Sequence, residues 1–193
     1  MPWPAPAEYQ QAIQNPQHCF VDPELQAGQP ILTPLGLTRV ASGRFASVYQ
    51  IRNGSRAWAV RCFVRQITDQ EHRYHLISQH LQKVQLSSLV EFVYQPQGIR
   101  LSGQWYPIVK MEWVEGKPLH TFVEYNLRAK KVLQDLAIQW RSLVAELHRV
   151  QVAHEDLQHG NILVSRGRVR LVDYDGLFIP SLRGEKSREL GHP

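Results

Sequence analysis

The chain has 193 residues, of which 43% are hydrophobic and 20% charged, a balance typical of a globular protein with a sizeable core. No apolar run approaches the roughly 20 residues of a membrane-spanning helix, and the start lacks a secretory signal, so we expect a cytoplasmic protein with no membrane partner. The net charge of +5 comes from scattered Lys and Arg residues, which predicts no nucleic-acid partner. Cys62 lies in the apolar stretch 58–64, where we expect a buried free thiol rather than a disulfide.

The first half of the chain is predicted to form a small antiparallel sheet. Residues 1–32 form an extension, with one short helix near 8–14, that wraps a surface before the first strand. Strands are expected where β-branched and aromatic residues cluster, at 35–41, 47–52, 57–64, 89–95 and 106–112. Asn53-Gly54 predicts a two-residue hairpin with positive φ at both residues. Asp69 would cap a helix that runs to about Leu81.

The second half is predicted to be mainly helical. We expect a short helix over 119–127 and a long one over 131–150, with two small strands, 161–164 and 168–172, around a turn at Arg166-Gly167. The apolar stripe of the long helix comprises Leu133, Leu136, Trp140, Leu143, Val144 and Leu147. The sequence thus predicts an α+β fold: an extension (1–32), a five-stranded antiparallel amino-terminal lobe with one helix (33–116), and a partial helical carboxyl-terminal lobe (117–193).

Three polar residues are the strongest candidates for a functional site. Asp156 and Asn161 lie in the stretch HEDLQHGN (154–161), and Asp173 follows in LVDYDG (171–176), after the two small strands. Oxygen ligands of this kind hold Mg²⁺, which also binds phosphates, and the remaining carboxylate can orient a hydroxyl group and accept its proton. The plainer alternative is that these residues satisfy two turns, but their spacing and the flanking strands favour a site.

These stretches resemble the catalytic loop H-R-D-L-x-x-x-N and the metal-binding loop D-F-G of the protein kinase superfamily. The resemblance covers residues from about Leu35 to Phe178. It implies an ATP- and Mg²⁺-dependent phosphotransferase with Asp156 as catalytic base and with Asn161 and Asp173 as metal ligands. The loop is also similar to the H-G-D-x-x-x-x-N loop of small-molecule phosphotransferases.

The same resemblance implies a nucleotide site. The stretch MEWVEG (111–116) looks like the kinase hinge, where Met111 would be the gatekeeper and the backbone of Glu112 and Val114 would bind adenine. The stretch ASGRFASV (41–48) resembles the kinase phosphate loop, of whose glycines only Gly43 remains, and Phe45 and Val48 also fit its pattern. Without the resemblance of the neighbouring segments, this stretch would be read as an ordinary hairpin turn. The residues that would sandwich adenine are Val48, Ala59 and Leu163, each of which is otherwise a core residue.

Several positions depart from the kinase pattern. Arg61 replaces the Lys of V-A-I-K and would contact the phosphates with a different geometry. Glu71 either pairs with Arg61 or is a solvated surface residue. Glu155 replaces the Arg that anchors a phosphorylated activation loop, so we expect no requirement for that phosphorylation. Gln158 replaces a Lys near the transferred phosphoryl group, and Asp175 replaces the Gly of D-F-G.

Three functions remain open. The leading prediction is a Ser/Thr protein kinase with a protein substrate. The second is a pseudokinase that binds nucleotide weakly or not at all and acts through a protein partner, as Arg61 and the altered phosphate loop suggest. The third is a small-molecule kinase. The helices that normally complete the carboxyl-terminal lobe are missing from the sequence, so we expect the chain to be a fragment of a longer domain.

Overall fold

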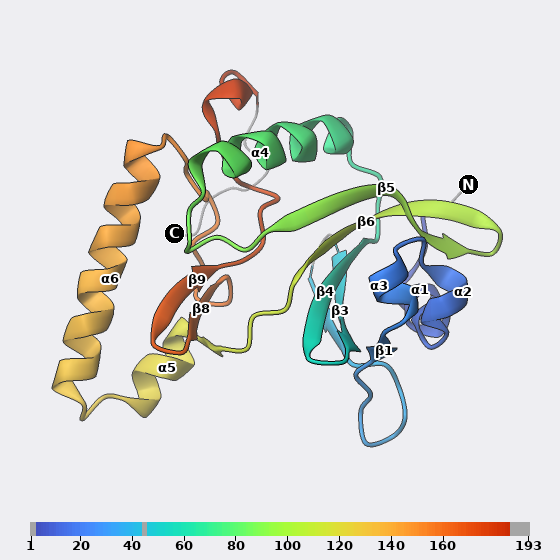
Figure 1. The fold of residues 1–193 in the computed structure, drawn as a ribbon, viewed down its shortest axis with the longest axis horizontal. Coiled ribbons are helices and arrows are strands. Elements are labelled where there is room, and N and C mark those ends of the chain that lie inside the picture. Colours follow the sequence, from blue (N-terminus) through green and yellow to red (C-terminus); the bar gives the residue numbers. More distant parts are fainter. Residues whose placement is uncertain (1–2, 44–45, 186–193) are drawn as a thin grey trace. The chain divides into compact units, whose positions relative to one another are not determined.

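A computed structural model describes residues 3–43 and 46–185 of the chain (Figure 1). The chain divides into two compact units, one formed by Met1–Tyr74 and Glu91–Trp113, the other by His75–Val90 and Val114–Pro193. The first unit is built on an antiparallel sheet and the second is mainly helical, which confirms the predicted α+β class. The predicted domain boundaries stay a prediction.

The sheet of the first unit contains six strands among the described residues. They are β1 (Gln29–Pro30), β2 (Val40–Ser42), β3 (Ala46–Asn53), β4 (Arg56–Phe63), β5 (Phe92–Leu101) and β6 (Gln104–Glu112). Their order is β1-β3-β4-β6-β5, with β2 also paired with β3, and every pair is antiparallel. Five of them correspond to the predicted strands, and the two-residue β1 is additional.

Two predicted strands have different bounds in the structure. The prediction of a strand over 35–41 is wrong in its first part, because residues 33–37 form a turn and only Val40–Ser42 pair with β3. The strand expected to start at residue 89 starts at Phe92 and continues to Leu101, past a bulge between Gln95 and Ile99. A bulge interrupts the alternation of side chains, so the sequence pattern underestimates the length of this strand.

The turn between β3 and β4 is placed one residue later than predicted. Asn53 pairs with Arg56 across the hairpin, so the central turn residues are Gly54 and Ser55 rather than Asn53 and Gly54. Of these, Gly54 has a positive φ of 59°, which suits the two-residue turn that requires glycine at its first central position. The Asn53 side chain instead donates a hydrogen bond to the backbone oxygen of Glu24, at 3.1 Å.

The amino-terminal extension forms three short helices rather than the single one predicted. They are α1 (Pro6–Ile13), α2 (Pro16–Cys19) and α3 (Pro23–Gln26). Each begins with proline, whose fixed φ suits the first helical position and whose missing N–H would have no partner there. The prolines of this segment therefore begin helices, whereas they were predicted only as helix ends.

These helices pack on one face of the sheet and form a common core with it. The core residues from the extension are Tyr9, Ile13, Cys19, Phe20 and Leu25, and those from the sheet are Tyr49, Ile51, Trp58, Val60, Cys62, Ile99, Leu101 and Ile108. The extension is thus an integral part of the first unit. Both cysteines are free and buried, as predicted for Cys62, and burial raises the pKa of the Cys19 thiol to about 12.

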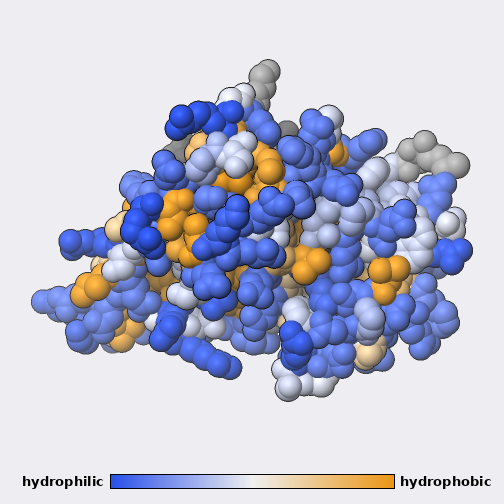
Figure 2. All heavy atoms as spheres, turned by 45° about the horizontal axis from the view of Figure 1, so that its top comes forward, coloured by the Kyte–Doolittle hydropathy of each residue, from blue (hydrophilic) through white to orange (hydrophobic). Residues whose placement is uncertain are grey.

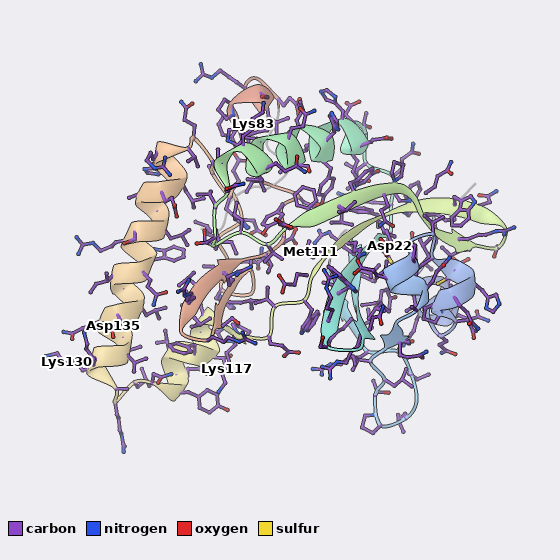
Figure 3. The ribbon with its side chains drawn as sticks, in the orientation of Figure 1. Asp22, Lys83, Met111, Lys117, Lys130 and Asp135 are labelled. Carbon is purple, nitrogen blue, oxygen red and sulfur yellow. The ribbon has the colours of Figure 1, made fainter. Side chains whose placement is uncertain are left out.

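A partly buried polar cluster also attaches the extension to the sheet, and we call it the Asp22 cluster: Asp22, Glu24, Gln95 and Lys110. The Lys110 ammonium on β6 lies 2.8 Å from both Asp22 carboxylate oxygens and 2.7 Å from Glu24 Oε2. Asp22, which is labelled in Figure 3, also accepts hydrogen bonds from Gln95 Nε2 and from the backbone of Glu24 and Leu25 at the start of α3. One carboxylate therefore both caps a helix and neutralises a buried lysine.

We expect Asp22→Asn to lower the free energy of unfolding at pH 7 by about 1–3 kcal/mol, because the buried Lys110 ammonium loses one of its two carboxylate partners. Burial raises the pKa of Asp22, but hydrogen bonds from Lys110 and the Leu25 backbone outweigh this effect and lower the pKa below its usual value. The stabilisation is therefore present above the pKa of the unfolded state, about 3.9, and is lost as the pH falls through the lower folded-state pKa.

Urea unfolding of both proteins between pH 7 and pH 3 measures this effect. The difference between wild type and Asp22→Asn should shrink in acid. Asp135→Asn is the control, because Asp135 makes only an exposed ion pair with Lys131 on a helix surface and should change stability little at any pH. A constant difference over the whole pH range would contradict the assignment.

The second unit contains the long helix and a small sheet. Its elements are α5 (Leu119–Tyr125), α6 (Lys130–Arg149), β7 (Lys117–Pro118), β8 (Ile162–Ser165), β9 (Arg168–Leu171) and the 3-10 helix η1 (Pro180–Leu182), while α4 (Gln70–Val84) runs into it from the first unit. The strands pair in the order β7-β8-β9, and Arg166 and Gly167 both have positive φ, as their predicted turn requires. The predicted stripe on α6 buries Leu136, Leu143 and Leu147.

On the face drawn in Figure 2, hydrophilic residues predominate and hydrophobic residues form separate patches. None of the helices in the described ranges combines the length and the apolar character needed to cross a membrane.

Candidate functional site

The hairpin of β8 and β9 brings the two polar loops of the second unit together. The loop 154–161 enters β8 and the loop 172–176 leaves β9, so both lie at the same end of the hairpin. The backbone N–H of Val172 donates to the oxygen of Asn161 at 3.0 Å, one step beyond the last strand pair. The structure therefore places Asp156 and Asn161 on a loop that is hydrogen-bonded to the loop of Asp173.

The buried His154 side chain also connects these two loops. Its side chain is 2% exposed, and burial lowers its pKa, which favours the neutral imidazole. His154 Nε2 lies 3.0 Å from the backbone oxygen of Val172, and because a carbonyl can only accept, Nε2 carries the proton. His154 belongs to the motif 154–161 but was not predicted as a site residue. Its position two residues before Asp156 was the feature of the sequence that indicated its role.

Asp156 is held by two amide side chains of its own loop. Asn161 Nδ2 donates to Asp156 Oδ2 at 2.6 Å and to the Asp156 backbone oxygen at 3.1 Å, and Gln158 Nε2 donates to Asp156 Oδ2 at 3.0 Å. The carboxylate is half-buried and its orientation is fixed. Glu155, immediately before it, has φ 61°, a left-handed conformation that is uncommon for this residue type and often found at functional loops.

Asp173 stands at the start of the second loop, also in a left-handed conformation with φ 67°. Its Oδ1 accepts a hydrogen bond from the backbone of Asp175 at 3.4 Å. Tyr174 anchors the loop, since its buried hydroxyl donates to the oxygen of Leu171 at 2.9 Å and accepts from the N–H of Val90 at 2.5 Å. Asp173, next to the anchored Tyr174, is half-buried, so solvent can reach it.

The donor chemistry of these loops fits a magnesium ion. Asn161 uses its amide nitrogen for Asp156, so its amide oxygen is the atom available to a cation, and Asp173 supplies a carboxylate. Within residues 3–43 and 46–185 there is no group of three or more His, Cys, Asp or Glu side chains that could hold a metal. This pattern suits Mg²⁺, which is commonly bound by one or two protein oxygens with water and phosphates rather than by a full protein cage.

In the first unit, the predicted nucleotide residues lie on one face of the sheet. Val48 pairs with Arg61, and Ala59 pairs with Met111, which is labelled in Figure 3. Directly opposed residues point to the same face, and so do Ala59 and Arg61, which are two apart on β4. The extension packs on the other face, where the side chains of Trp58, Val60 and Cys62 lie.

The predicted phosphate loop connects β2 and β3. Gly43 donates a backbone hydrogen bond to Ala46 at 2.9 Å, while Arg44 and Phe45 lie outside the described residues. A Cβ added at Gly43 would lie 3.6 Å from its nearest described atom, the backbone oxygen of Ala46, which is an ordinary van der Waals distance. The φ of Gly43 is not positive. The described fold therefore tolerates a side chain at this position, so the need for glycine has to come from something else.

The remaining predicted residues lie at the end of β6, just after it, and in β8. Glu112 ends β6, the backbone N–H of Trp113 donates to the oxygen of Ala57 at 2.9 Å, and Val114 begins the second segment of the second unit. Leu163 is partly exposed between the buried Ile162 and Val164 of β8.

The predicted pair of Glu71 and Arg61 stays a prediction. The pKa of Tyr94 is raised to about 12, mainly by burial and secondly by the charge of Glu71. Glu71 therefore lies near Tyr94. Tyr94 pairs with Val109, which pairs with Arg61, and all three therefore share one face of the sheet.

Residues 37–178 match the family model described as the protein kinase domain. This match covers most of the chain, so the chain belongs to the protein kinase family. The predicted superfamily membership is thereby confirmed. No curated protein matches the sequence closely enough to add a more specific relative.

Proposed function

We propose that the chain is an ATP- and Mg²⁺-dependent phosphotransferase that acts on Ser or Thr hydroxyl groups of a protein in the cytoplasm. The observation that carries the proposal is the fixed Asp156 carboxylate, held by Asn161 and Gln158 on a loop that is hydrogen-bonded to the loop of Asp173. General-base catalysis and metal binding require this kind of preorganisation. Both cysteines are buried and form no disulfide, which supports the proposed compartment.

Each residue has one role in the proposed reaction. Asp156 orients the substrate hydroxyl and accepts its proton as the hydroxyl oxygen bonds to the γ-phosphorus of ATP and the bond to the β-phosphate oxygen breaks, releasing ADP. Asn161 and Asp173 would hold Mg²⁺, which when bound offsets the charge of the phosphates. In the first unit, Arg61 would contact the phosphates, and Val48, Ala59 and Met111 would contact adenine, with the Glu112 and Val114 backbone.

The alternative is a pseudokinase scaffold, and Arg61 is the observation that favours it. Arg61 is 9% exposed and replaces the compact ammonium of the kinase lysine with a larger planar group. If this group occupies space that the phosphates need, nucleotide binds weakly and the chain acts through a protein partner.

Calorimetric titration with ATP, with and without Mg²⁺, tests the nucleotide site. We expect wild type to bind ATP more tightly with Mg²⁺, and Asp173→Asn to lose at least about tenfold in affinity only when Mg²⁺ is present. The matched control is Asp135→Asn, an exposed carboxylate on α6, which should titrate like wild type. Well-folded wild-type protein that binds no ATP in either condition would rule out the enzyme and leave the scaffold.

A further inference from the structure

Residues 31–40 form a closed hairpin, here called the tip hairpin, which extends away from the sheet of the first unit below the label β1 in Figure 1. Its arms are joined by hydrogen bonds from Arg39 N to Ile31 O and from Thr33 N to Leu37 O, both 2.7 Å. At the turn, Gly36 N donates to Thr33 O, and Gly36 has φ 77°, which glycine adopts without strain. Pro34 restricts the turn further because its φ is fixed.

The base of the tip hairpin is attached to α1. Thr38 is 1% exposed, its hydroxyl donates to the oxygen of Gln10 at 3.4 Å, and Gln10 Nε2 donates to the oxygen of Thr38 at 2.9 Å. The hairpin is therefore ordered before it meets any partner. A preordered segment loses little conformational entropy on binding.

The tip hairpin presents apolar side chains to solvent. Leu35 is 86% exposed, and the other exposed apolar residues are Leu32, Leu37 and Val40. Four large apolar side chains exposed within nine residues are an unusual feature for the surface of a globular unit and indicate an interaction site.

The surroundings of the tip hairpin are basic. Residues 25–43, which include the hairpin, contain Arg39 and no aspartate or glutamate. Arg39 on the hairpin and Arg52, which lies opposite Gln29 of β1, are exposed, whereas the exposed Arg56 is paired with Glu24. The carboxylates of the adjoining extension are occupied: Asp22 and Glu24 bind Lys110, Glu24 also binds Arg56, and Glu8 accepts a hydrogen bond from the backbone of Ala5.

We propose that the tip hairpin docks the chain onto an anionic membrane surface, with Leu35 and Leu37 inserted among the lipids and Arg39 at the headgroups. An apolar tip beside basic residues is the pattern of proteins that bind in the interface of a bilayer, and the cytoplasmic leaflet is negatively charged. A stable protein interface normally buries about 800 Å² on each partner, much more than one hairpin tip offers, whereas lipid needs no matching shape. This proposal departs from the prediction of no membrane partner, which rested on the lack of a spanning segment.

Sedimentation with lipid vesicles tests the proposal on the whole chain. Wild type should pellet with phosphatidylcholine vesicles that contain 30% phosphatidylserine, and less with pure phosphatidylcholine or in 0.5 M NaCl. The double variant Leu35→Ser and Leu37→Ser should bind at least about tenfold more weakly, because two inserted side chains are lost. Arg39→Gln should bind about threefold to fivefold more weakly.

The controls are equally exposed residues of the second unit. The double variant Leu127→Ser and Ile138→Ser removes side chains that are 68% and 59% exposed, and Arg149→Gln removes an exposed charge; both should bind vesicles like wild type. Unchanged thermal unfolding of the Leu35 and Leu37 variant verifies its fold. Equal pelleting of that variant and wild type would overturn the proposal, and so would a wild type that fails to pellet, which would favour an apolar groove on a protein partner instead.

Discussion

Replacement of Asp156 by Asn should lower the rate of phosphoryl transfer by about 10²- to 10⁴-fold, which is the contribution of a positioned general base. Asn keeps the size of the side chain and can still accept the hydrogen bond from Asn161 Nδ2, so the loop should keep its conformation. It removes the charge that would accept the hydroxyl proton. The affinity for ATP and Mg²⁺ should change much less than the rate, because Asp156 is not one of the proposed metal ligands.

The measurement is transfer of labelled γ-phosphate from ATP to the chain itself and to a mixture of Ser- and Thr-containing peptides. Asp135→Asn should transfer phosphate at the wild-type rate, since Asp135 lies on the exposed surface of α6. Transfer by wild type that persists unchanged in Asp156→Asn would exclude Asp156 as the base. Absence of transfer in well-folded wild type, together with weak or no binding of ATP, would favour the pseudokinase.

A variant of Gln158 separates positioning from chemistry. Gln158 Nε2 donates to Asp156 Oδ2, so Gln158→Ala should leave the base in place but less well oriented. We therefore expect a smaller loss of rate than in Asp156→Asn, with little change in the affinity for ATP. Equal rates of phosphoryl transfer for Gln158→Ala and wild type would contradict a positioning role for Gln158.

The candidate site was predictable from the sequence because its main residues lie on two short loops at a fixed spacing. Asp156, Asn161 and Asp173 needed only the local pattern and an intervening strand pair. The contacts that fix the site were not predictable in the same way. The His154 side chain donates to Val172, 18 positions away, and the Val90 N–H donates to the Tyr174 hydroxyl, 84 positions away. No local pattern identifies the partner of a single buried polar group.

In the fold, too, the elements set by the local sequence pattern were predictable and those that depend on distant contacts were not. Strands with regular alternation and the helix with a continuous apolar stripe were predicted close to their observed positions. The three helices of the extension were largely missed, because segments of four to eight residues are not stable alone and form here only through burial against the sheet. The turn at Gly36 was read as a strand for a related reason: the leucines around it suggest burial, whereas Leu35 and Leu37 are exposed.

The largest expected effect on stability comes from Phe20→Ala. Phe20 is 2% exposed in the core that the extension shares with the sheet, and its backbone forms a bridge to Ile99 of β5. Loss of a buried phenylalanine side chain typically lowers the free energy of unfolding by about 3–5 kcal/mol, because apolar contacts are lost and a cavity remains. Domains of this size are stable by only about 5–15 kcal/mol, so the variant should unfold at a much lower urea concentration.

Val21→Ala provides the matched control at the next position. Val21 is 51% exposed, so its truncation should change the free energy of unfolding by no more than about 0.5 kcal/mol. Limited proteolysis then distinguishes two ways in which Phe20→Ala can act. If the extension detaches first, cleavage within residues 3–28 will precede loss of the sheet; if the first unit unfolds as one body, both will disappear together. The shared core and the Asp22 cluster predict the second outcome, and equal stability of the two variants would contradict the packing of the extension on the sheet.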